Sequence, residues 1–200
     1  MGIFSSANLI ALIQAVGYLG LFAIIFAESG LFIGFFLPGD SLIFTAGFLA
    51  SQNLLNIWIL IPLLFLGAVL GDNFGYAFGR RIGPAIFKKE DGLLFRKKNL
   101  EKAHSYYEKY GAKTLVMARF MPIVRTFVPI LAGVGQMEYK KFFSYNLIGG
   151  ALWTVTLPLM GYFLGRSIPN IDKYLLPIVI GIIILSFLPS IFELIRSRRR

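Results

Sequence analysis

The chain contains six apolar stretches about as long as a bilayer is thick, and these constrain its fold more than any other feature. A helix that spans the hydrocarbon core needs about 20 predominantly apolar residues. The stretches are Asn8–Ala27, Ser29–Ala50, Ile57–Gly79, Thr114–Gly135, Phe142–Gly165 and Tyr174–Ile195. With 56% hydrophobic residues, the chain lacks the polar side chains that would cover a soluble domain of 200 residues. We therefore expect an all-α integral membrane protein.

Two of the six stretches are interrupted, and we do not expect them to span the membrane. Both contain proline and charge: Pro38, Gly39 and Asp40 in the second, and Arg119, Pro122 and Arg125 in the fourth. Proline removes a helical hydrogen bond, and broken backbone at membrane depth is tolerated only where it is buried in protein or lines a cavity. The sequence thus predicts about four transmembrane helices and two re-entrant helical hairpins.

Positive charge is concentrated in two segments that border apolar stretches. Ten basic and four acidic side chains lie from Arg80 to Lys113, and four arginines form the tail from Arg196 to Arg200; the other charges cancel, so the net charge is +10. Short loops rich in Lys and Arg face the cytoplasm. We expect a multi-pass protein of the cytoplasmic (inner) membrane with its basic loop and C-terminus in the cytoplasm. The first hairpin then enters from outside and the second from inside.

Two parts of the chain share a pattern at an offset of 86 residues. Ala46-Gly47 matches Ala132-Gly133, and Gly75-Tyr76-x-x-Gly79-Arg80-x-Ile82 matches Gly161-Tyr162-x-x-Gly165-Arg166-x-Ile168. We expect a single membrane domain over residues 1–200. It would contain inverted repeats at about 28–83 and 114–169, a basic loop at 84–113, and a C-terminal span at 174–195 with its basic tail. Interrupted segments at corresponding places in two halves indicate a transporter's substrate site; glycines that serve only close helix packing are the alternative.

Four ionisable residues lie inside the apolar stretches: Glu28, Asp40, Arg119 and Arg125. A charge at the bilayer centre costs roughly 2.5–3.5 kcal/mol on insertion scales, so four without partners would cost on the order of 10–14 kcal/mol. We expect the two acids to pair with the two arginines. Structural salt bridges are the alternative, but apolar replacements of a buried pair are often as stable.

The functional interpretation gives each group a task. The planar fork of arginine suits phosphate, so Arg119 and Arg125 are candidates to bind an anionic headgroup. Removal from water favours the neutral form of a carboxylate, which makes Glu28 or Asp40 a candidate proton carrier. Asp72 is either a fifth member of the site or a group at a helix-packing contact.

Other classes of chemistry find little support in the residue types present. The chain has no cysteine, and its single histidine, His104, lies in the most polar stretch. We expect no metal site, no cofactor and no catalytic residue, and therefore not an enzyme. The basic residues border membrane segments, so we expect no nucleic-acid partner.

The motifs resemble those of the bacterial DedA family, also called the VTT or SNARE-associated membrane-protein family. The resemblance covers roughly residues 10 to 170. Its motifs are Glu28, Phe36-x-Pro38-Gly39-Asp40, Gly71-Asp72-x-x-Gly75-Tyr76-x-x-Gly79-Arg80-x-x-Gly83, Ala118-Arg119-Phe120-x-Pro122-x-x-Arg125-Thr126, Ala132-Gly133 and Asn146-x-x-Gly149-Gly150-x-x-Trp153. It implies an inner-membrane protein with two re-entrant hairpins that maintains the envelope in dependence on the proton-motive force.

Family members are associated with moving undecaprenyl phosphate or other phospholipids across the bilayer, and eukaryotic relatives act as lipid scramblases. The family's important acids match Glu28 and Asp40, and its important arginines match Arg119 and Arg125. We take Pro38, Gly39, Asp72, Pro122 and Thr126 as supporting positions. The expected function is translocation of a lipid phosphate coupled to protons, with membrane lipids and protons as partners. The alternatives are a proton-coupled small-ion or drug exchanger and a passive scramblase; oligomerisation stays open.

Overall fold

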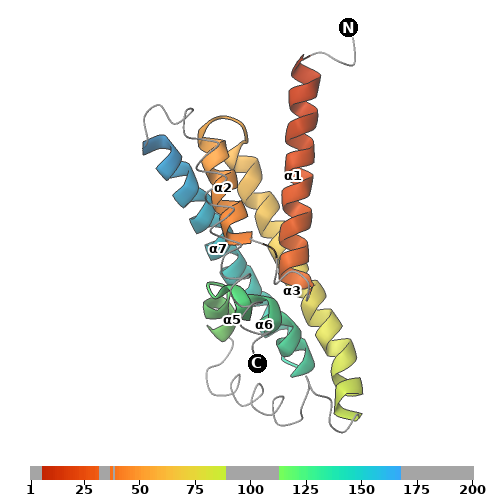
Figure 1. Cartoon of the computed structure of the whole chain (residues 1–200). Coiled ribbons are helices and arrows are strands. Elements are labelled where there is room, and N and C mark those ends of the chain that lie inside the picture. Colours follow the sequence, from red (N-terminus) through yellow and green to blue (C-terminus); the bar gives the residue numbers. More distant parts are fainter. Residues whose placement is uncertain (1–5, 32–36, 38, 89–112, 168–200) are drawn as a thin grey trace, which may run out of the picture. The chain divides into compact units, whose positions relative to one another are not determined.

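A computed structural model describes residues 6–31, 37, 39–88 and 113–167. Every regular element within these ranges is an α-helix, and they contain no strand. The helices are α1 (Ser6–Gly30), α2 (Gly39–Ser51), α3 (Ile57–Lys88), α5 (Lys113–Ala118), α6 (Pro122–Val134) and α7 (Tyr139–Ser167) (Figure 1). Pro38, most of the basic loop, the expected span at 174–195 and the arginine tail lie outside the described residues.

Two of the helices are long and apolar enough to cross a bilayer, namely Ile57–Ile82 within α3 and Tyr139–Ser167. Large apolar side chains on α3 are exposed at intervals of four residues, which places them on one face of the helix. They are Leu66, Leu70, Phe74 and Phe78. A continuous exposed apolar stripe is typical of a surface that contacts lipid. The all-helical class and these two spans agree with the prediction, whereas the total number of spans and the inverted topology stay predictions.

The described residues fall into two compact units. The first contains those of Met1–Ile24, Phe36–Leu64 and Thr154–Arg200, and the second contains those of Ile25–Phe35 and Phe65–Trp153. Each unit is built from segments distant in sequence, because the long helices contribute their two ends to different units.

In the first unit α2 packs closely on the end of α7. A methyl group added at Gly47 would overlap the backbone of Pro158, and one added at Gly161 would overlap the carbonyl oxygen of Phe44. Glycine at these positions allows the two helix backbones to approach each other. At the end of the contact, Gln52 Nε2 donates a hydrogen bond of 3.3 Å to the carbonyl oxygen of Gly165.

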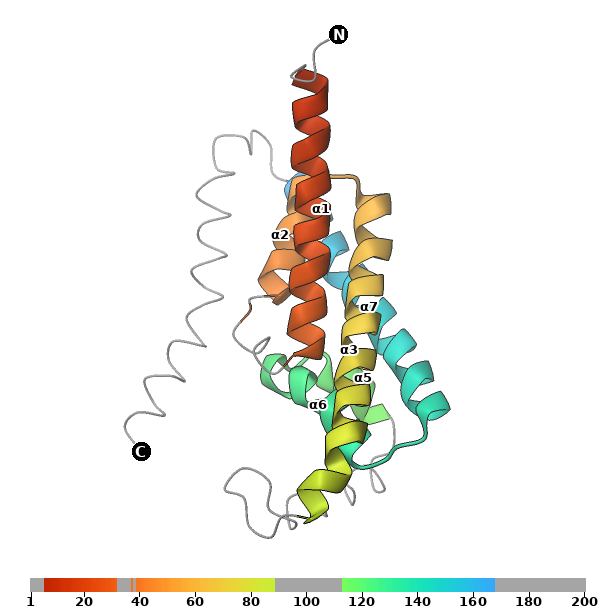
Figure 2. The ribbon, with the colours of Figure 1, turned by 90° about the vertical axis from the view of Figure 1, so that its right-hand side faces the viewer.

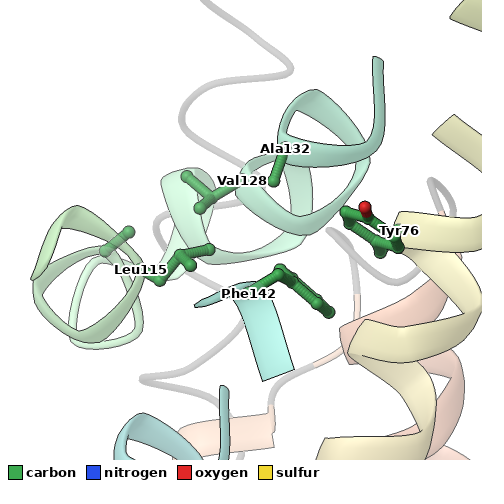
Figure 3. Packing of buried hydrophobic residues seen from close by; sticks show 6 residues of the cluster. Tyr76, Leu115, Val128, Ala132 and Phe142 are labelled. Carbon is green, nitrogen blue, oxygen red and sulfur yellow. The ribbon is translucent and has the colours of Figure 1, made fainter. Parts of the chain in front are cut away.

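In the second unit α6 packs on α3 in the same manner (Figure 2). A methyl group at Gly133 would overlap the carbonyl oxygen of Tyr76, and one at Gly79 would overlap that of Ile130. The Tyr76 hydroxyl donates to the carbonyl oxygen of Met137 at 2.5 Å. A buried cluster from four helices fills the space beside this contact (Figure 3), and its members are Tyr76, Leu115, Ala118, Val128, Ala132 and Phe142.

The two contacts use residues that the sequence pattern relates. Gly47 and Gly133 are 86 positions apart, as are the partners Phe44 and Ile130. The carbonyl oxygen of Ile130 faces Gly79, which is one turn beyond Gly75, the position that corresponds to Gly161. In each unit the short helix therefore packs on the long helix of the other proposed repeat: α2 on α7, and α6 on α3. The repeated glycines have a packing role in both units.

Candidate functional site

Two arginines six residues apart lie at the break between α5 and α6 and directly after it. The N–H of Met121 donates to the carbonyl oxygen of Ala118 at 2.9 Å, and the N–H of Arg125 donates to that of Met121 at 3.0 Å. Pro122 begins α6, where its missing N–H breaks no helical hydrogen bond. Arg119 thus lies in the turn and Arg125 in the first turn of α6. Pro122 thus lies at the interruption that the sequence predicted, whereas the second proline of this stretch, Pro129, lies within α6.

Both arginines are buried, and each is paired with a buried carboxylate. Arg119 Nη2 lies 2.5 Å from Asp72 Oδ2, a residue of α3. Arg125 Nη2 forms an ion pair with Glu28 Oε1, a residue in the last turn of α1. The exposed fractions of these four residues lie between 2% and 7%. Two positive and two negative groups balance, which offsets the cost of holding each charge away from water.

Two residues of α7 hold the arginines in place. Arg119 Nη2 also donates to Asn146 Oδ1 at 2.8 Å, and Asn146 Nδ2 donates to the carbonyl oxygen of Val69 at 3.2 Å. The Trp153 ring lies 4.5 Å from the guanidinium carbon of Arg125 and 5.7 Å from that of Arg119. A desolvated cation over an indole ring gains about 2 kcal/mol. We call Glu28, Asp72, Arg119, Arg125, Asn146 and Trp153 the arginine cluster.

A cavity of about 10 Å³ lies inside the cluster. Its walls are formed by Asp72, Leu115, Arg119, Arg125, Val128, Pro129 and Asn146. This volume is about that of one water-sized probe, far below the several hundred Å³ of a typical ligand pocket. A phosphate group can therefore reach the arginines only if the carboxylates or helices move.

The other predicted residues lie at different places. Thr126 follows Arg125 and is fully buried, and its hydroxyl has no hydrogen-bond partner within the described ranges. Asp40 and Gly39 belong to the first unit, at the start of α2. Asp40 is half-buried there, and a carboxylate in a first helical turn is favoured by the helix dipole.

The carboxylate opposite Arg119 belongs to Asp72, whereas the sequence led us to expect the acids at Glu28 and Asp40 to pair with the two arginines. Asn146 and Trp153 were recognised only as part of a motif and were not predicted as site residues. Their spacing of seven places them on one face of a helix, and an amide inside the apolar stretch Phe142–Gly165 was the signal that could have identified Asn146. No group of three or more His, Cys, Asp or Glu that could hold a metal occurs in residues 6–31, 39–88 and 113–167.

Comparisons with known proteins agree with the motifs. Residues 37–163 match the VTT domain. The chain is 44% identical over 195 residues to protein DedA of Escherichia coli (strain K12), which covers 96% of this chain and 89% of that protein. It is 43% identical over 182 residues to an uncharacterized membrane protein of Mycobacterium tuberculosis (strain ATCC 25618 / H37Rv), covering 90% and 79%. Inner membrane protein YghB of E. coli (strain K12) is 29% identical over 192 residues, covering 93% and 88%. No solved structure matches the chain.

Proposed function

Because the chain is a membrane protein of the DedA family, we propose that it moves undecaprenyl phosphate or another phospholipid across the cytoplasmic membrane in a step coupled to proton binding. The observation that carries the proposal is the pair of buried arginines, each neutralised by one carboxylate. Arginine binds phosphate and carboxylate with the same planar fork. A lipid phosphate can therefore take the place of Asp72 and Glu28 opposite the two arginines.

The charge balance of the cluster links this exchange to protons. A phosphate monoester carries a charge of about −1.5 to −2 near pH 7. If it entered while both carboxylates stayed ionised, about two negative charges would remain uncompensated in a membrane-embedded site, which is costly. Protonation of Asp72 and Glu28 removes that excess and frees both guanidinium groups. We assign proton transfer to these carboxylates and to Asp40, and phosphate binding to Arg119 and Arg125.

The remaining residues support the exchange in our proposal. Pro122 begins α6 and places Arg119 in the turn before it, and we assign Pro38-Gly39 the same part at the first interruption. The Thr126 hydroxyl, buried without a hydrogen-bond partner in the described part of the chain, offers a donor beside Arg125. Asn146 and Trp153 keep the arginines in position while their carboxylate partners are neutral.

Leaflet exchange of a labelled undecaprenyl phosphate analogue in proteoliposomes tests the proposal. We expect exchange that depends on a pH gradient and is lost in Asp72→Asn and Arg125→Ala proteins shown to be folded. Arg166→Gln, which changes an exposed arginine of α7, is the matched control and should retain exchange. Exchange without gradient dependence would favour a passive scramblase, and a change in lipid mass would favour an enzyme. Exchange of neither this lipid nor ordinary phospholipids above empty liposomes would refute lipid transport.

The size of the cavity favours a second candidate, a proton-coupled exchanger of small ions. A space of about 10 Å³ holds one water or a small ion without any rearrangement. In that case proteoliposomes should show a proton flux coupled to the small ion. The Arg119→Met substitution should abolish this flux, while lipid exchange stays at the level of empty liposomes.

The proposed orientation makes a separate prediction. The chain contains no cysteine, so single cysteines report their side of the membrane without background. In cells, a membrane-impermeant maleimide should label Leu54→Cys from outside, and Lys140→Cys only after the membrane is opened. Both positions are exposed. Labelling of Lys140→Cys in intact cells would contradict the cytoplasmic placement of the loop between α6 and α7.

A further inference from the structure

The second unit contains an open groove separate from the cavity of the arginine cluster. Its volume is about 540 Å³. The second half of α3 and the first residue of α7 line it, with Asn73, Tyr76, Ala77, Arg80, Arg81 and Tyr139. We call it the arginine–tyrosine groove. Its volume falls within the range of small-molecule pockets, so it can take a ligand without the rearrangement that the small cavity requires.

The groove carries two positive charges that no described carboxylate neutralises. Arg80 and Arg81 are both exposed, and the lining contains no acidic side chain. Arg80 Nη1 lies 3.5 Å from the hydroxyl oxygen of Tyr76, which is a neutral group. Arg119 and Arg125 differ in this respect, because each has a carboxylate partner. Among the residues that the structure describes, the groove therefore presents two guanidinium groups that an anion can approach.

The aromatic wall of the groove is held in a fixed arrangement. The Tyr76 hydroxyl donates to the carbonyl oxygen of Met137, and the Tyr139 hydroxyl donates to Asn73 Oδ1 at 3.0 Å. The two tyrosine rings lie 5.7 Å apart, and Phe142 stacks on Tyr76 at 4.4 Å. Side chains already ordered in this way lose little entropy when a ligand binds.

The position of the groove along α3 indicates the kind of anion. The apolar span of α3 ends at Ile82, so Arg80 and Arg81 lie where a spanning helix meets the headgroup layer. The exposed rings of Phe74 and Phe78 lie within the apolar span of the same helix, where a spanning helix meets the acyl chains. Arginine at this depth is suited to phosphate oxygens, which accept from guanidinium groups, and tyrosine rings are typical of the headgroup level.

We infer that the arginine–tyrosine groove binds the phosphate of an anionic lipid headgroup at the membrane surface. The phosphate lies between Arg80 and Arg81, and the headgroup lies against Tyr139. The inference requires a membrane protein but not lipid transport, since the groove and the arginine cluster share no residue. A failure of the exchange experiment above would therefore leave it standing.

The test is lipid binding to the purified full-length chain in neutral detergent. Short-chain phosphatidic acid is titrated, with phosphatidylcholine and inorganic phosphate as the other two probes, and bound lipid is counted by native mass spectrometry. We expect saturable binding of phosphatidic acid and at least about tenfold weaker binding in the Arg80→Gln/Arg81→Gln protein. Phosphatidylcholine and inorganic phosphate should bind at least about tenfold more weakly than phosphatidic acid.

The matched control is Lys140→Gln/Lys141→Gln. It removes the same charge from exposed residues that directly follow Tyr139 but do not line the groove. We expect less than about a twofold change in this protein, because charge near a surface acts weakly once salt screens it. If both double variants lost phosphatidic acid binding equally, the binding would be a general attraction to basic residues, and the inference would be overturned. No loss in the Arg80→Gln/Arg81→Gln protein would also overturn it, and so would inorganic phosphate that binds as tightly as the lipid.

Discussion

Replacement of Arg119 by methionine should lower the free energy of unfolding by about 3–5 kcal/mol, the cost of leaving a buried charge without its partner. The methionine fills much of the arginine's volume, but the Asp72 carboxylate, 2.5 Å away in the native protein, then has no cation of its own. Unfolding in mixed micelles of increasing SDS content would measure the change.

The double variant Asp72→Asn/Arg119→Met separates the structural part of this effect from the functional part. With both charges gone, a good share of the lost stability should return, because buried ion pairs can often be replaced by neutral groups. Lipid exchange should nevertheless stay absent, since the phosphate has lost its arginine. If exchange returned together with stability, Arg119 would be a structural residue.

Arg166→Met is the matched control for the single variant. Arg166 is also an arginine over an aromatic ring, 5.1 Å from the ring of Tyr162, but it is exposed. Its loss should cost less than about 1 kcal/mol, as for other surface charges. An equal cost for Arg119→Met and Arg166→Met would contradict the burial of the cluster.

The second large effect is expected at the glycines of the helix contacts. Gly133→Ala places a methyl group on the carbonyl oxygen of Tyr76 and 2.7 Å from the nitrogen of Arg80. Both are backbone atoms and cannot move aside as a side chain would. Overpacking costs about 1–3 kcal/mol where side chains can adjust, so we expect at least 3 kcal/mol here, measured by the same SDS titration.

Gly47→Ala should behave like Gly133→Ala, because its added methyl group meets the backbone of Pro158 in the corresponding way. Gly20→Ala is the control: no atom lies within 4 Å of the added group among the described residues. Alanine favours a helix by about 0.5–1 kcal/mol over glycine, so this protein should be unchanged or slightly more stable. Tolerance of alanine at Gly133 would show that α3 and α6 do not approach as closely as described.

The sequence predicted the parts of the fold that depend on local chemistry. The lengths of the apolar stretches identified α3 and α7, and Pro122 located the interruption beside Arg119. The ends of helices were predicted less accurately where an apolar stretch was taken to end at a charged residue. A stretch was expected to end before Glu28, yet α1 continues to Gly30, because a glutamate paired with Arg125 need not end a helix.

The partners within the site could not be predicted in the same way. Asp72 and Arg119 are 47 residues apart, and Asn146 is 27 residues from Arg119. These pairs form because α3, α7 and the turn after α5 meet in the second unit, and periodicity along one helix does not contain that information. The family motif named Asn146 and Trp153 together, but only the fold gives them a common task at the two arginines.

The crossed packing of the short helices also bears on the order in which the protein can assemble during synthesis. The glycine face of α2 is complete once Ser51 has been made, but its partner on α7 begins near Pro158. Roughly a hundred residues separate them, which at about 5–20 residues per second corresponds to about 5–20 s of elongation. During that interval α2 is without its native neighbour on α7. The last part of the VTT domain to leave the ribosome is thus the part that closes the first unit.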